Sequence, residues 1–226
     1  MNEQANEKKF AGEAAAEYVE NGMTVGLGTG STVKYTIEKL AERMNNEGLR
    51  FRGVPTSFQT ERLAQSLGIP LVTLDEAIEL DLTIDGADEL DNRLNGIKGG
   101  GGALLREKIV ASASKRTIWT AHAAKKVEKL GTFPLPVEIV PFAAAVVLRK
   151  LEGEGMRPEI RQVNGEPYET DNGNWIVDLH LGEIDDPEHL EQWLNLLPGV
   201  VENGLFLNRT DMAVIAEGSK VTVIKK

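Results

Sequence analysis

The sequence contains no cysteine, and this absence excludes several kinds of site. Disulfide scaffolds, thiol nucleophiles and thiolate metal centres all require that side chain. Histidine is also scarce: the chain has only His122, His180 and His189, with neither HxxxH nor HxH spacing. We therefore expect no histidine-rich metal site.

Basic residues are outnumbered, with 25 Lys and Arg against 35 Asp and Glu, and the formal net charge at pH 7 is −10. Nucleic acids and anionic membranes both attract basic surfaces, so we expect neither as a partner. A small phosphorylated ligand is compatible with this charge, because a few local N–H donors and lysines outweigh a distant negative surface.

Long hydrophobic runs are missing as well. The longest apolar run, residues 137–148, contains Glu138 and Pro141 and is shorter than the roughly 20 apolar residues that a membrane helix needs. The first ten residues are polar and carry charges of both signs, unlike a secretory signal. We therefore expect a cytoplasmic protein.

The 226 residues, 41% hydrophobic and 27% charged, suit one large domain or a large domain plus a small one. Short apolar segments alternate with segments of helical periodicity, which predicts a doubly wound, mostly parallel sheet. The predicted strands are 23–27, 51–54, 71–73, 80–84 and 118–120, and the predicted helices are 7–21, 31–44, 59–66 and 103–113. In such α/β folds, ligands bind at the carboxyl ends of the strands.

The pattern changes near residue 132, where the stiff segment 133–136 contains two prolines. Predicted helices at 143–151 and 187–196 and short strands near 160–163 and 175–180 indicate a small α+β domain. Two further strands are predicted at 211–216 and 220–224. We expect a Rossmann-like domain of residues 1–131 plus 206–226 and a smaller domain of residues 132–205.

The first segment with chemical character is Gly26–Thr32, where a strand runs into a glycine-rich turn and a helix. Glycines let an anion approach the backbone, and the first N–H groups of a helix are unsatisfied donors. The segment matches neither a Walker A loop nor the GxGxxG dinucleotide motif. It predicts an anion-binding turn, and a tight turn with a capping serine is the alternative.

The second segment places Asp85 and Asp88 at the carboxyl end of a strand, with Gly86 at the turn. Two neighbouring carboxylates can share a proton or accept hydrogen bonds from sugar hydroxyls. With Glu89 or Asp91 they could instead hold a divalent cation. An acidic surface loop is the non-functional alternative.

The third segment is Lys98 followed by four glycines, Gly99–Gly102, directly before the predicted helix 103–113. A flexible linker usually explains such a run, but no domain boundary is visible here. A backbone cradle for an anion or an oxyanion explains it better.

The fourth segment is the helix 103–113, whose circumference is apolar except for a polar strip of Lys108 and Ser112. We therefore expect the helix to be largely buried. Glu107 lies between apolar neighbours on it, and burial would raise the pKa of this carboxyl group, as suits a general base. A surface salt bridge is the alternative interpretation of Glu107.

These motifs, in this order and spacing, resemble the type A ribose-5-phosphate isomerases: GLGTGST at 26–32, DGADE at 85–89, KGGG at 98–101 followed by ALLREKI, and FPLPVE at 133–138. The resemblance spans essentially the whole chain. It implies a metal-independent aldose–ketose isomerase of the non-oxidative pentose phosphate pathway, acting on a pentose 5-phosphate through a cis-enediolate. It also implies a Rossmann-like domain with a smaller α+β domain, and a homodimer or homotetramer.

The resemblance assigns roles residue by residue. It implies that Glu107 is the catalytic base and that Asp85 helps to open the furanose ring. The other implied catalytic or substrate-binding residues are Thr29, Gly30, Ser31, Thr32, Gly86, Ala87, Asp88, Lys98, Gly99, Gly100 and Gly101, with Lys125 and a more distant Lys8 at the phosphate.

Two positions depart from the family pattern, which has Asp-x-Ser before the lysine and alanine after the third glycine. Here His122-Ala123-Ala124 precede Lys125, and Gly102 follows Gly101. We interpret Gly102 as a looser helix start.

Two other functions fit some of these motifs. A non-catalytic sugar-phosphate sensor would need the cradle without the base. A metal-dependent sugar-phosphate enzyme would use Asp85, Asp88 and Asp91.

Overall fold

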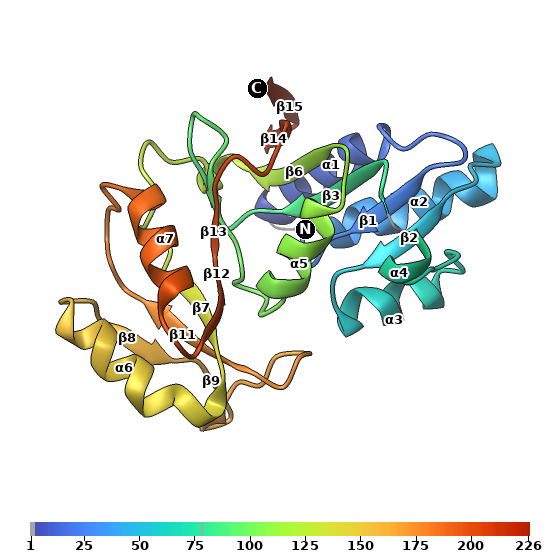
Figure 1. The fold of residues 1–226 in the computed structure, drawn as a ribbon. Helices are drawn as coiled ribbons and strands as arrows, with labels where there is room; N and C mark the ends of the chain where they lie inside the picture. The colour runs from blue at the N-terminus through green and yellow to red at the C-terminus, as the bar shows by residue number, and fades with distance from the viewer. Residues whose placement is uncertain (1–2, 78) are drawn as a thin grey trace. The chain divides into compact units, whose positions relative to one another are not determined.

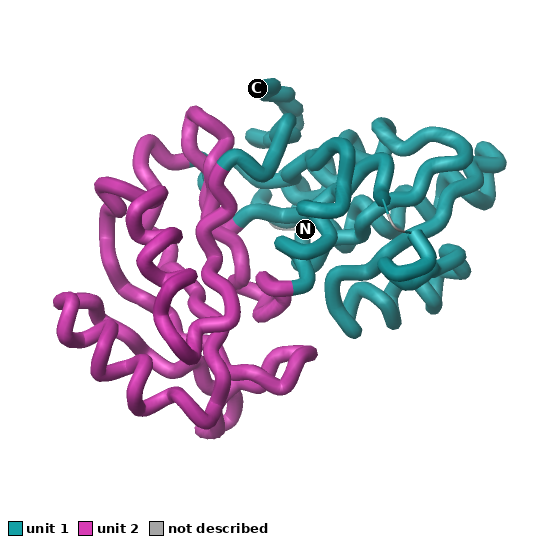
Figure 2. The backbone as a smooth tube through the Cα atoms, viewed as in Figure 1, with its two compact units in different colours: residues 1–87, 106–126, 208–226 teal, residues 88–105, 127–207 magenta. Residues whose placement is uncertain are grey.

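The computed structural model describes residues 3–77 and 79–226 (Figure 1). The chain forms two compact units: unit 1 comprises residues 1–87, 106–126 and 208–226, and unit 2 comprises residues 88–105 and 127–207 (Figure 2). No helix in the described part of the chain is long and apolar enough to cross a membrane.

Unit 1 is built on a six-stranded sheet in the order β15-β14-β6-β3-β1-β2. All neighbouring strands are parallel except the β14–β15 pair, which confirms the predicted doubly wound, mostly parallel sheet. The strands are β1 (Thr24–Leu27), β2 (Arg52–Pro55), β3 (Leu82–Gly86), β6 (Thr117–His122), β14 (Met212–Glu217) and β15 (Lys220–Lys225). Parallel strands buried on both faces explain their nearly continuous apolar character.

The helices of this region are α1 (Glu3–Ala16), α2 (Val33–Glu47), α3 (Phe58–Ser66), α4 (Leu74–Ala77) and α5 (Leu104–Ser112), and a 3₁₀ turn, η1 (Ala123–Lys125), follows β6. Helix α1 ends five residues before the predicted end at residue 21. Arg43 Nη1 donates hydrogen bonds to the backbone carbonyl oxygens of Ala16 and Val19 at 2.6 and 3.1 Å, so a side chain distant in sequence satisfies the end of the helix.

The predicted strand 71–73 is wrong, since only a single bridge joins Leu71 to Gly53. The chain turns into α4 instead. The Glu76 carboxylate accepts hydrogen bonds from Thr73 N and Oγ1 at 2.8 and 2.9 Å, and Glu76 N donates to Thr73 Oγ1 at 3.2 Å. This reciprocal pair is a capping box, which favours a helix start over continuation of a strand.

The predicted polar strip on α5 is also wrong in part, because Lys108 is buried and Ile109 is 46% exposed. Val110 on the same helix packs with Val54 and Leu80. Since α5 is apolar almost all round, its hydrophobic pattern does not indicate which face packs inward.

Unit 2 contains a four-stranded antiparallel sheet, β12-β7-β11-β8, together with a three-stranded sheet, β13-β5-β4, and the hairpin β9–β10. Its strands are β4 (Glu89–Leu90), β5 (Gly96–Ile97), β7 (Leu135–Ile139), β8 (Pro158–Ile160), β9 (Gln162–Val163), β10 (Glu166–Pro167), β11 (Trp175–Leu179), β12 (Val200–Asn203) and β13 (Leu205–Phe206). Its helices are α6 (Ala144–Gly153), preceded by the 3₁₀ turn η2 (Pro141–Ala143), and α7 (Pro187–Leu196).

The division into units differs from the expected domains at residues 88–105, 127–131 and 206–207, which we expected in the Rossmann-like domain and which belong to unit 2. The strands β4 and β5 pair with each other, and β5 also pairs with β13, instead of joining the six-stranded sheet. Val127 N donates to Leu90 O at 2.9 Å, which ties the segment after residue 126 to the same unit. Two-residue strands carry too little periodicity to be recognised in the sequence.

Candidate active site

The glycine-rich turn after β1 lies against Asp85 at the end of β3. The Asp85 Oδ1 atom accepts hydrogen bonds from Thr29 N at 3.1 Å and from Gly86 N at 2.7 Å. A Cβ atom at Gly28 would lie 2.1 Å from the same oxygen, so only glycine lets this carboxylate approach the turn. Asp85 is 2% exposed. Unit 1 therefore brings together two of the segments that the sequence singled out.

Thr29 points its hydroxyl into the protein. Its Oγ1 atom lies 2.7 Å from Thr56 Oγ1, 2.8 Å from Ser57 Oγ and 3.3 Å from Thr60 Oγ1. Sequence reasoning missed these three hydroxyls, although they follow β2 directly and strand ends are where it expected ligands. The Thr29 hydroxyl thus holds the turn against the residues after β2, while the Thr29 backbone N–H donates to Asp85.

The rest of the turn borders a surface cavity of about 460 Å³, lined by Gly28, Gly30, Ser31, Lys34, Ile37, Gln59, Thr60 and Leu63. Ser31 is exposed and Gly30 has a left-handed backbone with φ of 127°. Thr32 stands at the N-cap of α2 without a capping hydrogen bond from its side chain. The capping-serine alternative therefore does not describe this turn.

Glu107 stands in the first turns of α5 and is 4% exposed. Its predicted burial is confirmed, and the alternative of a surface salt bridge is excluded by that burial. The neighbouring Arg106 guanidinium stacks on the Phe58 ring, 4.4 Å from its centroid. Because the Glu107 carboxylate is buried and so shielded from water, it is suited to accept a proton.

His122 ends β6 and is 3% exposed. Its Nε2 atom lies 3.2 Å from Gln4 Nε2, and its Nδ1 atom has no hydrogen-bond partner among the described residues. Burial lowers the pKa of His122, the nearby charges of Lys125 and Lys8 lower it further, and Glu7 opposes them. The end of β6 therefore gathers two lysines near a neutral imidazole.

Ala87 also belongs to unit 1, whereas Asp88, Lys98 and the glycine run belong to unit 2. The Asp88 Oδ2 atom accepts a hydrogen bond from Gly100 N at 2.7 Å, and a Cβ atom at Gly100 would lie 2.7 Å from Asp88 Oδ1. Lys98 is 2% exposed, with its Nζ atom 5.4 Å from the centroid of the Phe206 ring. The glycine run is thus part of a folded loop and not a linker.

Glu89 and Asp91, which the sequence offered as cation ligands, bind backbone amides instead. The Glu89 carboxylate accepts from Gly131 N and Phe133 N at 2.7 and 2.6 Å. Asp91 Oδ1 accepts from the backbone N–H groups of Arg93 and Asn95, both at 2.8 Å. In residues 3–77 and 79–226, no three His, Asp or Glu side chains are grouped so that they could hold a metal ion.

Comparisons with known proteins identify the family. The profile of Ribose 5-phosphate isomerase A (phosphoriboisomerase A) matches residues 52–220. The chain is 52% identical over 223 residues to ribose-5-phosphate isomerase A of Listeria monocytogenes serovar 1/2a, covering 98% of this chain and 99% of the relative. The protein of the same name from Bifidobacterium adolescentis is 50% identical over 211 residues, or 93% and 91% of the two chains.

Solved structures share the fold. Ribose 5-phosphate isomerase A from Methanocaldococcus jannaschii superposes with a TM-score of 0.93 at 41% identity, covering 98% of this chain and 99% of that one. A D-ribose-5-phosphate isomerase in complex with phospho-erythronic acid gives a TM-score of 0.95 at 37% identity over 100% of both chains. This chain therefore belongs to the ribose 5-phosphate isomerase A family.

Proposed function

We propose that this chain interconverts D-ribose 5-phosphate and D-ribulose 5-phosphate, with Glu107 as the general base. The observation that carries the assignment is the buried Glu107 carboxylate on the helix that begins directly after the Lys98–glycine loop. Membership of the isomerase family supports the substrate, and the relative solved with phospho-erythronic acid supports a phosphorylated sugar derivative as ligand.

In the proposed reaction the Glu107 carboxylate takes the proton from C2 of the open-chain aldose, and the electron pair of that bond moves through C1 to the carbonyl oxygen. The product of this step is a cis-enediolate. Glu107 then returns the proton to C1 while the O2 proton passes to O1, which leaves the ketose. A single carboxyl group acting on one face of the sugar suffices.

Negative charge develops on O1 and requires donors that are already oriented. The Lys98 ammonium and the amides of the glycine loop are our candidates. Because Gly100 N donates to Asp88, we assign this role to the amides of Gly99 and Gly101.

The other residues bind the substrate. We propose that Asp85 assists ring opening, that Asp88 accepts a sugar hydroxyl, and that the 29–32 and 86–87 backbone contacts the sugar. Lys125, with Lys8 further away, would hold the phosphate. Since a charged sugar phosphate does not diffuse through a membrane, we place the reaction in the cytoplasm.

The test is the variant Glu107→Gln, assayed with ribose 5-phosphate in heavy water with a strong chelator present. We expect kcat to fall about 10²–10⁴-fold while the fold is retained, and the wild-type protein to incorporate deuterium at C1 of the ketose. The control Glu42→Gln, on the exposed face of α2, should keep wild-type turnover.

Three results would contradict the proposal. Near-normal turnover of Glu107→Gln would show that Glu107 is not the general base. A wild-type protein that binds the sugar without exchange would be a sensor. Loss of wild-type activity with the chelator would favour the metal-dependent alternative.

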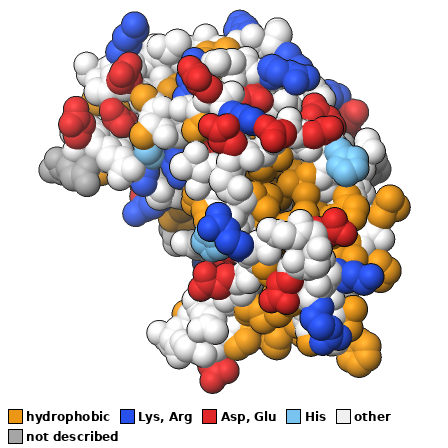
Figure 3. Space-filling model, turned by 90° about the vertical axis from the view of Figure 1, so that its left-hand side faces the viewer, with side chains coloured by type: hydrophobic (Ala, Val, Ile, Leu, Met, Phe, Trp, Pro, Cys, Tyr) orange, Lys and Arg blue, Asp and Glu red, His pale blue; other side chains and the backbone are white. Residues whose placement is uncertain are grey.

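We also propose that the chain forms a homodimer or homotetramer. Several large apolar side chains of unit 2 are exposed, and they concentrate around η2 and the end of α7: Val140, Phe142, Val146, Leu196 and Val201. We call these five residues the unit-2 apolar patch. Figure 3 shows hydrophobic side chains exposed among charged ones on one face of the molecule.

A further inference from the structure

The glycine loop of unit 2 is held from outside by Arg161, a residue that no sequence motif indicated. Arg161 Nη1 donates to Gly99 O at 2.8 Å and to Gly100 O at 3.2 Å. The same guanidinium donates from Nε and Nη2 to the two carboxylate oxygens of Asp178, at 2.9 and 2.6 Å. Both side chains are mostly buried, with 16% and 19% exposure, so this two-bond ion pair is fixed in direction.

Tyr168 supports the loop from the other side of the same hairpin. Its backbone N–H donates to Arg161 O at 2.8 Å, which places the two residues at the base of β9–β10. Its hydroxyl lies 3.5 Å from Gly101 O. A Cβ atom at Gly102 would lie 2.3 Å from the Tyr168 hydroxyl oxygen, and Gly102 has φ of 78°. The left-handed backbone and the nearby Tyr168 hydroxyl therefore both favour glycine at position 102.

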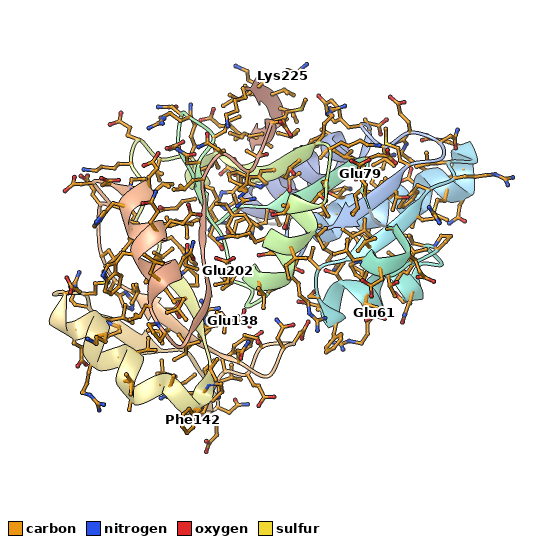
Figure 4. The ribbon with its side chains drawn as sticks, in the orientation of Figure 1. Glu61, Glu79, Glu138, Phe142, Glu202 and Lys225 are labelled. Atoms are coloured by element: carbon orange, nitrogen blue, oxygen red, sulfur yellow. The ribbon has the colours of Figure 1, made fainter. Side chains whose placement is uncertain are left out.

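The segment after Tyr168 is anchored by Glu138, which lies on β7 and is fully buried (Figure 4). Its Oε1 atom accepts hydrogen bonds from Thr170 Oγ1 and Asn174 Nδ2, both at 2.9 Å. The turn between β10 and β11 is thus tied to the four-stranded sheet, and the hairpin base is a rigid support.

The contacts of Arg161 determine the direction of particular N–H groups. In a planar trans peptide, the carbonyl oxygen of one residue and the N–H of the next point in opposite directions. The peptide group between Gly99 and Gly100 is held at both ends: its carbonyl oxygen accepts from Arg161, and its N–H donates to Asp88. Arg161 at Gly100 O turns the N–H of Gly101 away from the guanidinium.

We propose that Arg161, held by Asp178, is a positioning residue that orients the Gly101 amide toward the developing oxyanion of the isomerase reaction. The inference rests on the proposed function, in which this loop stabilises the enediolate. Four consecutive glycines have the widest conformational freedom of any such run, so their amides are not preorganised by the chain itself. An outside clamp supplies that preorganisation, which is the property that electrostatic catalysis requires.

The experiment compares Arg161→Gln, Arg161→Lys and Asp178→Asn with wild type in kcat and KM for ribose 5-phosphate. We expect Arg161→Gln to lower kcat about 10–100-fold with KM changed less than about threefold, because misplacing a transition-state donor affects kcat. Arg161→Lys and Asp178→Asn should fall between it and wild type. The matched control is Arg157→Gln, near β8, whose guanidinium donates to His180 O, and it should behave as wild type.

Chemical rescue separates positioning from general destabilisation. Guanidinium chloride at about 50 mM should raise kcat of Arg161→Ala several-fold compared with an equal concentration of sodium chloride. The free guanidinium ion can occupy the space of the deleted Arg161 guanidinium and donate the same hydrogen bonds. It should not raise kcat of wild type or of Glu107→Gln.

Four results would overturn the inference. The first is an Arg161→Gln protein whose kcat is within twofold of wild type, and the second is a change in that variant confined to KM. The third is a fully active Asp178→Asn protein. The fourth is unfolding of every Arg161 and Asp178 variant, which would show that the ion pair is needed for folding. An inactive wild-type protein would instead reject the proposed function, so the two failures are distinguishable.

Discussion

At the scale of single residues, burial decides what a charged group can do. Asp85, Glu107 and Lys98 are each at most 4% exposed. The sequence predicted these residues because Asp85 ends a strand, Lys98 precedes a glycine run, and Glu107 lies between apolar neighbours on a helix. It did not predict Arg161, since an arginine between two short edge strands has no distinguishing pattern. Its role depends on contacts with residues about sixty positions away.

His122 gives a residue-scale prediction for stability as a function of pH. Burial lowers the pKa of its imidazole in the folded state below the ordinary value of 6.5, and Lys125 and Lys8 act in the same direction against Glu7. Below about pH 6.5, His122 therefore binds a proton more readily in the unfolded chain than in the folded chain. The free energy of unfolding should fall as the pH is lowered through this range, and His122 should add no slope above it.

The measurement is urea unfolding at pH 7.5 and 5.5 for wild type and His122→Gln. The variant should lose less stability on acidification, and the difference for one proton is at most about 1.4 kcal/mol per pH unit. The control His180→Asn removes an exposed histidine of unit 2 and should retain the full acid-side loss. Equal losses in wild type and His122→Gln would show that this imidazole is not excluded from protonation by the fold.

At the scale of elements, long segments with clear periodicity were predicted well. The helix at Pro187–Leu196 has the predicted bounds, and β1, β2 and α3 are within one residue of theirs. Errors arose where a side chain distant in sequence, or a local cap, decided the outcome. Arg43 ends α1, and Glu76 turns the predicted strand 71–73 into the start of α4. The two-residue strands β4 and β5 pair with each other, and β13, more than 100 residues further along the chain, pairs with β5.

Glu89, on the two-residue strand β4, connects this strand to the backbone at residues 131 and 133. It is 4% exposed and accepts the N–H groups of Gly131 and Phe133. In Glu89→Gln an amide NH₂ replaces one acceptor oxygen, so one buried backbone donor loses its partner. We expect the free energy of unfolding to fall by about 1–3 kcal/mol, measured by urea denaturation.

The control for Glu89 is Glu188→Gln on α7, an exposed carboxylate 3.7 Å from Arg93. A surface ion pair of this kind contributes less than about 1 kcal/mol. If the two substitutions destabilised the protein equally, the backbone contacts of Glu89 would not be what fixes the segment at 131–133.

At the scale of the whole molecule, the four ordered motifs predicted the family and both the parallel sheet and the smaller α+β part. The boundary between the units was harder, because residues 88–105 are covalently flanked by unit 1 and yet pair with strand β13. The sequence also offered only a resemblance as its reason for a homo-oligomer. The structure adds exposed side chains, of which Phe142 at 100% and Leu196 at 82% are the most exposed.

Two of the segments that carry these side chains contact each other within unit 2. Val140 N donates to Gly199 O at 2.9 Å, and a Cβ atom at Gly199 would lie 2.6 Å from Ala143 Cβ, so η2 contacts the segment after α7. In a chain of net charge −10, like charges repel two copies, and association requires apolar burial that exceeds this repulsion. The unit-2 apolar patch supplies such a surface, and screening by salt should strengthen the association.

We predict that Phe142→Ser weakens self-association, because it removes the most exposed aromatic group of the patch without disturbing the core. In sedimentation experiments wild type should have two or four times the mass of one chain. The variant should shift toward one chain at micromolar concentration, by a tenfold or greater rise in the dissociation constant. Val163→Ser, a control at an exposed valine of the β9 strand outside the patch, should sediment as wild type. A wild-type protein that stays a single chain at high salt would contradict the homo-oligomer, and an unaltered Phe142→Ser assembly would move its interface away from this patch.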